Sequence, residues 1–188
     1  MVSIQEKLIL WTGKRHFGKT TSVAKLAQTA RDKGFNVGGL LAPCVCRKGE
    51  LVGFDAFGLR SKKRAPLARC KAGKGKAGPF NFIADGLKLG NVALSVEATQ
   101  SADLVIVDEF GPLELGGRGW RRNVDSLLIS SDALILLVVR QELADAVRQL
   151  YAGFPQRELV ATMRNSINEV ITMLKNRRHH LEGQNVQA

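Results

Sequence analysis

Apolar residues along the chain form two kinds of pattern, which predict different elements. Short, nearly unbroken apolar runs predict strands buried on both faces, and they lie at 7–11, 103–109, 133–139 and 157–161. Apolar residues at helical spacing occur between these runs, first at Val23, Leu26, Ala27 and Ala30. Buried strands that alternate with amphipathic helices predict an α/β fold with three layers and a mostly parallel central sheet.

The remaining segments fit between these elements. Two apolar segments, 36–46 and 51–57, flank a Lys48-Gly49 turn and predict an added β-hairpin. The other expected elements are a short strand at 79–83, a helix capped by Asp85 and ending near Gln100, helices at 124–129 and 141–151, and a last helix capped by Thr162 or Asn165. We expect residues 1–180 to form a single domain and residues 181–188 to be a polar C-terminal tail.

A phosphate-binding loop is predicted where the first strand ends. The spacing G-x-x-x-x-G-K-[ST] of a P-loop is present, and the expected nucleotide-binding residues are Gly13, Lys14, Arg15, His16, Phe17, Gly18, Lys19, Thr20 and Thr21. Backbone N–H groups of this loop would surround a polyphosphate, and Lys19 would contact the β- and γ-phosphates. The Thr20 hydroxyl is a ligand for the accompanying Mg²⁺. The strand before the loop and the helix after it favour this interpretation over a chance match.

His16 occupies a position where many P-loops have a third glycine. A side chain there either points to solvent at a tolerant position, which we favour, or crowds the loop and forces a strained backbone. In a further alternative His16 or Arg15 contacts phosphate.

Two adjacent carboxylates follow the second buried strand. In a P-loop protein, an acid at this place holds the Mg²⁺, and we assign that role to Asp108. Successive residues at a strand end point in different directions, so Glu109 can orient and polarise the attacking water. We expect the strands before Lys19 and Asp108 to be neighbours, so that both side chains meet at one pocket.

A glycine-rich loop, 110–119, leaves the end of the same strand, where open α/β sheets bind ligands. Arg118, Arg121 and Arg122 follow within or just after it. Each is a candidate to steady the γ-phosphate, but for any single one of them we favour a place on a solvated face.

The excess of positive charge is concentrated in one segment. The chain has 188 residues and a formal net charge of +11, and residues 60–76 contain eight cations and no acid. We interpret 60–78 as a mobile basic surface loop. A lid over the nucleotide and a nucleic-acid patch are the alternatives, although aromatic residues that would stack bases are missing.

The cysteine count and the lengths of the apolar runs exclude some classes of protein. The three cysteines, an odd number, argue against a disulfide framework. No apolar run approaches the roughly 18 residues that cross a bilayer, and residues 1–7 show no separate signal-peptide segment. We therefore expect a cytoplasmic protein without membrane contact, either monomeric or weakly oligomeric.

The P-loop, the Asp108-Glu109 pair and the following Gly-Pro-Leu-Glu-Leu together resemble the nucleoside-triphosphatase family first described from thermophiles, which has a human cancer-related relative. The Asp108–Leu115 run matches that family's acidic segment, and Gly119-Trp120 is similar to its bacterial branch. The resemblance implies a P-loop α/β fold and slow, Mg²⁺-dependent hydrolysis of ATP, GTP and other nucleoside triphosphates. By position it implies phosphate and metal roles for Lys19 and Thr20, a magnesium role for Asp108 and a catalytic role for Glu109.

Three functions are compatible with these residues. The first is a nucleoside triphosphate hydrolase, with Lys19 and Glu109 as catalytic residues, and we favour it. The second is a phosphoryl transferase acting on a nucleotide or another small molecule, with the basic segment closing over the acceptor. The third is a nucleotide-dependent module that binds nucleic acid through residues 60–76.

Overall fold

The computed structural model describes residues 5–70 and 80–185, and its strands form one sheet. The sheet has nine strands in the order β6-β5-β4-β2-β7-β8-β1-β9, with β3 paired to β4 outside this path. The strands are β1 (Leu8–Gly13), β2 (Val37–Leu41), β3 (Cys44–Arg47), β4 (Glu50–Gly58), β5 (Arg64–Cys70), β6 (Phe80–Phe82), β7 (Leu104–Phe110), β8 (Leu134–Arg140) and β9 (Gln156–Val160). Neighbours among β2, β7, β8, β1 and β9 are parallel, so the predicted parallel central sheet is confirmed.

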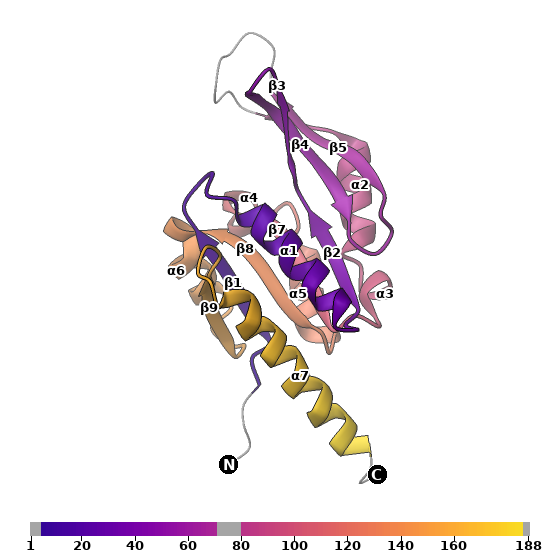
Figure 1. The fold of residues 1–188 in the computed structure, drawn as a ribbon. Coiled ribbons are helices and arrows are strands. Elements are labelled where there is room, and N and C mark those ends of the chain that lie inside the picture. The colour runs from indigo at the N-terminus through magenta and orange to yellow at the C-terminus, as the bar shows by residue number, and fades with distance from the viewer. Residues whose placement is uncertain (1–4, 71–79, 186–188) are drawn as a thin grey trace.

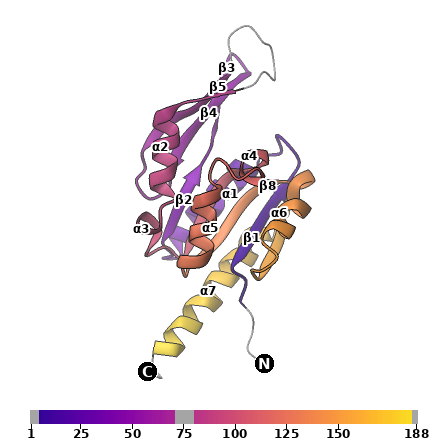
Figure 2. The ribbon, with the colours of Figure 1, turned by 180° about the vertical axis from the view of Figure 1, so that it is seen from behind.

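Helices cover both faces of the parallel strands and give the predicted three layers (Figures 1 and 2). They are α1 (Lys19–Asp32), α2 (Ala84–Ala93), α3 (Val96–Thr99), α4 (Pro112–Leu115), α5 (Arg121–Ser130), the 3-10 turn η1 (Gln141–Leu143), α6 (Ala144–Leu150) and α7 (Ser166–Asn185). No helix among the described residues is long and apolar enough to cross a membrane.

Alternating side chains of β1 enter two separate hydrophobic clusters. Ile9 and Trp11 pack in the cluster that includes apolar residues of α1 and α7. Leu8 and Leu10 belong to the cluster on the other face, with residues of α5 and α6. Because both faces of this strand are covered, every residue of Leu8–Gly13 is buried, which explains the unbroken apolar run in the sequence.

The predicted β-hairpin is present but is part of a larger antiparallel arm made of β3, β4, β5 and β6 (Figure 1). The hairpin turn lies at Lys48 and Gly49, which have φ angles of 49° and 80°. Positive φ at both central residues is the geometry that suits a tight hairpin turn. The arm joins the parallel strands through β4, which pairs antiparallel with the end of β2.

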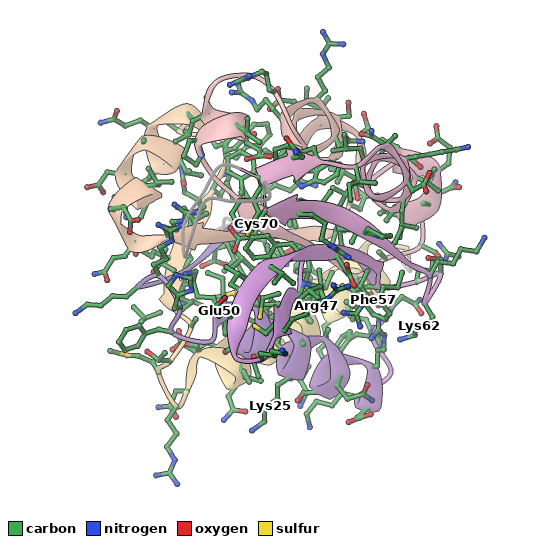
Figure 3. All side chains as sticks on the ribbon, turned by 90° about the horizontal axis from the view of Figure 1, so that it is seen from above. Lys25, Arg47, Glu50, Phe57, Lys62 and Cys70 are labelled. Atoms are coloured by element: carbon green, nitrogen blue, oxygen red, sulfur yellow. The ribbon has the colours of Figure 1, made fainter. Side chains whose placement is uncertain are left out.

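The basic segment 60–78 is not a surface loop throughout, so that prediction is wrong in part. Residues Arg64–Cys70 form β5 between β4 and β6, with Leu67 and Ala68 buried. Asp55 of β4 forms ion pairs with Arg64 and Arg69, at 2.7 and 2.6 Å. Lys62 remains exposed at the periphery of the molecule (Figure 3). The part of the predicted loop at 71–79 lies outside the described residues.

Two helix predictions also need correction. The helix expected from Asp85 to Gln100 is divided into two helices, α2 and α3, which are separated by Leu94 and Ser95. Ser95 caps the second helix, because its hydroxyl accepts a hydrogen bond from the Ala98 N–H. Asp85 lies in the first turn of α2 and does not cap it. The expected tail at 181–188 is helical as far as Asn185, because α7 continues through this segment.

Candidate functional site

The carboxyl ends of three parallel strands form the edge that carries the site. Strand β8 lies between β1, which leads to the P-loop, and β7, which leads to Asp108. The expectation that β1 and β7 are neighbours is therefore wrong. All three strands are parallel, so their ends still meet at one edge, and the last residue of β8 is added to the site. That residue is Arg140, which is paired in register with Gly13.

The P-loop connects β1 to α1 as the sequence pattern predicts. Residues 14–18 are exposed, and α1 begins at Lys19 directly after Gly18. Gly18 has φ 70°, a left-handed conformation that glycine adopts at little cost, and it offers no side chain to cap the helix. The first N–H groups of α1 are therefore directed to the loop, where the positive end of the helix dipole also favours an anion.

His16 combines features of two of the alternatives considered from the sequence. It is exposed, as expected for a side chain that points to solvent, and it lies beside the site cavity. Its φ angle is 62°, so this residue also has the strained left-handed backbone expected where a glycine is usual. Strain of this kind, of order 1–3 kcal/mol, is typical of ligand-binding loops.

Lys19 is held inside the site with its charge available. The residue is 9% exposed, and its Nζ donates a hydrogen bond to the Lys14 carbonyl oxygen at 2.9 Å. Burial lowers the pKa of Lys19, and the nearby carboxylate of Glu109 opposes that shift. An ammonium that is desolvated and only partly compensated is well suited to a multiply charged phosphate.

A β-bulge at the end of β7 separates the two acidic side chains. The pairing of β7 with β8 passes from Val107↔Leu137 to Phe110↔Val139, so two residues of β7 face one residue of β8. Glu109 has φ 60° at this bulge. As a result Asp108 is fully buried whereas the Glu109 side chain is exposed to the cavity. Bulges beside active sites commonly direct a side chain in this way.

Asp108 is a buried carboxylate with several donors around it. It accepts hydrogen bonds at 3.0 Å from the N–H groups of Ala42 and Glu109, and another from the Thr20 side chain. Burial, followed by the charge of Glu109, raises the pKa of Asp108 to about 6, and these hydrogen bonds oppose the rise. Two oxygen donors, the Thr20 hydroxyl and the Asp108 carboxylate, thus lie together, and a pair of this kind could hold Mg²⁺.

The arginines proposed from the sequence do not line the cavity, whereas two others do. Arg121 forms an ion pair with Asp125 at 2.8 Å and lies over the Tyr151 ring. Arg118 and Arg122 are exposed and do not reach the cavity walls. Arg15 and Arg140 line it instead.

Arg140 was missed because its position depends on the order of the strands. The one signal in the sequence was the general rule that parallel strands end at the same edge of a sheet, which places the last residue of each such strand near the site.

The cavity beside these residues has a volume of about 510 Å³. The loop after β7 forms part of its wall, and Glu114 fixes the shape of that loop. The buried Glu114 carboxylate accepts hydrogen bonds from the N–H groups of Gly111, at 2.8 Å, and Trp120, at 3.2 Å. Burial raises the pKa of Glu114, and these two hydrogen bonds oppose the rise.

Two of the solved structures that resemble this chain illustrate the shared fold. The human cancer-related nucleoside triphosphatase, known from a solution structure, superposes with a TM-score of 0.65 at 21% identity, covering 92% of this chain and 98% of that protein. Crystalline THEP1 from the hyperthermophile Aquifex aeolicus gives a TM-score of 0.62 at 18% identity, covering 89% of this chain and 98% of that one.

Sequence relatives are closer. Nucleoside-triphosphatase THEP1 of Archaeoglobus fulgidus is 34% identical over 165 residues, which cover 87% of this chain and 95% of the relative. The protein of the same name from Methanothermobacter thermautotrophicus is 34% identical over 146 residues, covering 75% of this chain and 80% of the relative. The family model described as NTPase matches residues 8–181, a span that includes every element from β1 into α7. This chain therefore belongs to the NTPase family that includes the THEP1 nucleoside-triphosphatases.

Proposed function

We propose that this protein is a Mg²⁺-dependent nucleoside triphosphate phosphohydrolase that converts ATP, GTP and other nucleoside triphosphates to the diphosphate and phosphate. The observation that carries the proposal is the bulge in β7. It buries Asp108 against Thr20 and leaves the neighbouring Glu109 carboxylate facing the same cavity as Lys19. One acid can thus serve the metal while the other remains available as a base.

Each residue has a distinct part in the proposed reaction. Backbone N–H groups of the loop 13–21 hold the polyphosphate, and Lys19 neutralises charge on its β- and γ-phosphates. Thr20 and Asp108 would hold the Mg²⁺, which when bound withdraws charge from the phosphate oxygens. The Glu109 carboxylate orients a water in line with the γ-phosphate and accepts its proton.

Arg140 gives the site a second cation on the γ-phosphate side. It lines the cavity together with Lys19 and Glu109, and its charge is close enough to Lys19 to lower the lysine pKa. Two cations so close together repel each other until a polyanion lies between them. We assign to Arg140 the stabilisation of charge on the γ-phosphate during transfer, the role that we had considered for Arg118, Arg121 and Arg122.

A phosphate-release panel tests the proposal. Purified protein is incubated with ATP, GTP, CTP or UTP, each with Mg²⁺ or with a chelator, and free phosphate is measured. We expect release from several triphosphates with Mg²⁺ and none above the blank with the chelator. Release that is the same in both conditions would contradict the metal role of Thr20 and Asp108.

The basic segment does not favour a nucleic-acid function. Its Arg64 and Arg69 are engaged by Asp55, which leaves fewer free cations than the sequence suggests. Binding of nucleic acid through residues 60–76 therefore stays a prediction, as do the cytoplasmic location, the monomeric or weakly oligomeric state and the placement in the bacterial branch.

A further inference from the structure

The cavity extends well beyond the space that a γ-phosphate needs. One end is polar and is lined by Arg15, His16, Lys19, Glu109 and Arg140. The other end is built from the antiparallel arm and α2 and is almost entirely apolar. Its volume of about 510 Å³ lies within the range of about 300–1,000 Å³ that is typical of small-molecule sites.

Aromatic and aliphatic side chains make the walls of the apolar end. Phe54 and Phe80 meet edge to face with their ring centroids 5.2 Å apart, and Leu67 and Leu87 line the cavity near them. Phe82, on the short strand β6, also lines it and is 52% exposed. An aromatic ring so exposed at the wall of a cavity provides a stacking face for a flat, apolar molecule.

Trp120 joins this wall to the body of the protein. Its ring lies against Gly90 of α2, where a Cβ atom would be only 2.3 Å from the ring. The same residue donates its backbone N–H to Glu114, in the loop that follows Asp108 and Glu109. The apolar end is thus held in a fixed relation to the acidic pair.

The position of the cavity indicates that it does not hold the nucleobase. In a P-loop the lysine reaches toward the β- and γ-phosphates, so the nucleoside leaves the loop on the side away from that lysine and from the catalytic acid. The cavity lies on the side of Lys19 and Glu109, and Thr21 does not line it. An occupant of the apolar end would face the γ-phosphate from the side at which a nucleophile attacks.

We propose that the apolar end of the cavity binds a second substrate, a small flat molecule with an apolar aromatic body and one hydroxyl group, and that the γ-phosphoryl group is transferred to that hydroxyl. This inference rests on the proposed nucleotide site. The walls of the arm select the apolar body. Among the described residues that line the cavity, the Glu114 carboxylate is already engaged by the N–H groups of Gly111 and Trp120, and the other charged side chains lie at the polar end, so the hydroxyl is directed to Glu109.

The transfer step is balanced without any further reactant. The hydroxyl oxygen forms a bond to the γ-phosphorus, and the bond between that phosphorus and the β,γ-bridging oxygen breaks. The bridging electron pair leaves with the nucleoside diphosphate. The hydroxyl proton passes to the Glu109 carboxylate, which is in the cavity wall beside the polar end. Water and the alcohol therefore compete for the same phosphoryl group.

The experiment measures how the γ-phosphate divides between the two nucleophiles. Protein, Mg²⁺ and γ-labelled ATP are incubated with 2-naphthalenemethanol, with benzyl alcohol or with glycerol, and the labelled phosphomonoester and free phosphate are quantified. We expect the aromatic alcohols to give a phosphomonoester, with a ratio of transfer to hydrolysis at least about tenfold above that for glycerol, because glycerol has no apolar body to bury.

Two variants, one at a residue that lines the cavity and one at a residue outside it, test the role of the apolar wall. Phe82→Ala removes the exposed stacking face, and we expect it to lower the transfer-to-hydrolysis ratio for 2-naphthalenemethanol by about tenfold. The matched control is Val92→Ser, which alters a residue 58% exposed on α2 that does not line this cavity, and its ratio should equal that of the wild type. Thermal denaturation of both variants establishes that they are folded.

Each other result overturns the inference. Free phosphate without any phosphomonoester would leave the hydrolase intact and remove the acceptor site. Equal use of glycerol and the aromatic alcohols would show that the apolar walls select nothing. A Phe82→Ala protein whose KM for ATP rises in parallel with the loss of transfer would place the nucleobase in the cavity. If neither product forms, the proposed nucleotide site itself has failed.

Discussion

The parallel half of the sheet and the antiparallel arm contribute opposite kinds of surface to one cavity. Charged residues lie at or close to the ends of β1, β7 and β8, and two residues near those ends, His16 and Glu109, have left-handed backbones. The arm contributes mostly apolar side chains from β4, β5 and β6. Strained, charged groups suit chemistry on a phosphate, and smooth apolar walls suit selection of an organic molecule.

This contrast indicates that the parallel strands and the arm have different functions. The parallel strands make a fixed platform whose edge holds the charged groups, whereas the arm is an addition that shapes what can approach them (Figures 1 and 2). We therefore expect changes at the platform edge to affect binding and turnover of every triphosphate. Changes in the arm should affect mainly the partner that receives the phosphoryl group.

Among the changes at the platform edge, we expect Lys19→Ala to have the largest effect, a loss of ATP affinity. Loss of a partly buried charge that faces a triphosphate should weaken ATP binding on the order of a thousandfold. Calorimetric titration with a non-hydrolysable ATP analogue measures this. Lys25→Ala is the matched control, because Lys25 is an exposed lysine of the same helix that does not line the cavity. Comparable weakening in both variants would argue against a specific phosphate contact by Lys19.

Glu109→Gln should leave nucleotide binding nearly intact and reduce turnover roughly a hundredfold or more, since the amide cannot accept the proton of the nucleophile. Steady-state phosphate release and analogue binding are measured on the same preparation. The control is Glu50→Gln at the hairpin turn, an exposed carboxylate that does not line the cavity. A Glu109→Gln protein with the original rate would mean that another group is the base.

The buried Asp108 carboxylate should affect how the free energy of unfolding of the nucleotide-free protein depends on pH. The pKa of Asp108 is raised to about 6, so folding favours its protonated form, and its contribution to the free energy of unfolding decreases as pH rises from about 4 to about 6. A rise of about two pKa units corresponds to at most about 3 kcal/mol. In Asp108→Asn this decrease should disappear.

Denaturant unfolding of the wild type, Asp108→Asn and the exposed control Asp85→Asn at several pH values measures this contribution. The stability of Asp108→Asn relative to the wild type should increase with pH, whereas that of Asp85→Asn should not follow the same course. Parallel pH profiles for all three proteins would contradict the burial of a carboxylate whose pKa is raised.

The smallest effect is expected from Arg140→Ala. In the proposed reaction Lys19 also places a charge on the same phosphate, so we expect a loss of about tenfold in kcat, the low end of the range for a hydrogen bond to a charged group. The comparison variant is Arg118→Ala, at an exposed arginine that does not line the cavity. If Arg118→Ala reduces kcat more than Arg140→Ala does, the assignment of the second cation is wrong.

The sequence predicted local features better than features that depend on distant pairing. Gly13–Thr21 and the Asp108-Glu109 pair are contiguous, so their spacing carried the information. Arg140 became part of the site because β8 lies between β1 and β7, and the order of parallel strands is not written in any one segment.

The arm was harder to predict for the same reason. The basic residues of β5 made this segment look like a loop in the sequence. The strand forms because it pairs with β4 and β6 and because Asp55 of β4 neutralises part of its charge. The bulge that separates Asp108 from Glu109 also arises from cross-strand pairing, although the sequence did predict that these two side chains point in different directions.

The most direct test of the account is a crystal structure with Mg²⁺ and a non-hydrolysable ATP analogue. We expect the β- and γ-phosphates to contact Lys19 and the metal to lie beside the Thr20 hydroxyl and the Asp108 carboxylate. The γ-phosphate should face Glu109 and the apolar cavity. A nucleotide bound elsewhere, or one whose base fills the cavity between Phe54 and Phe82, would contradict it.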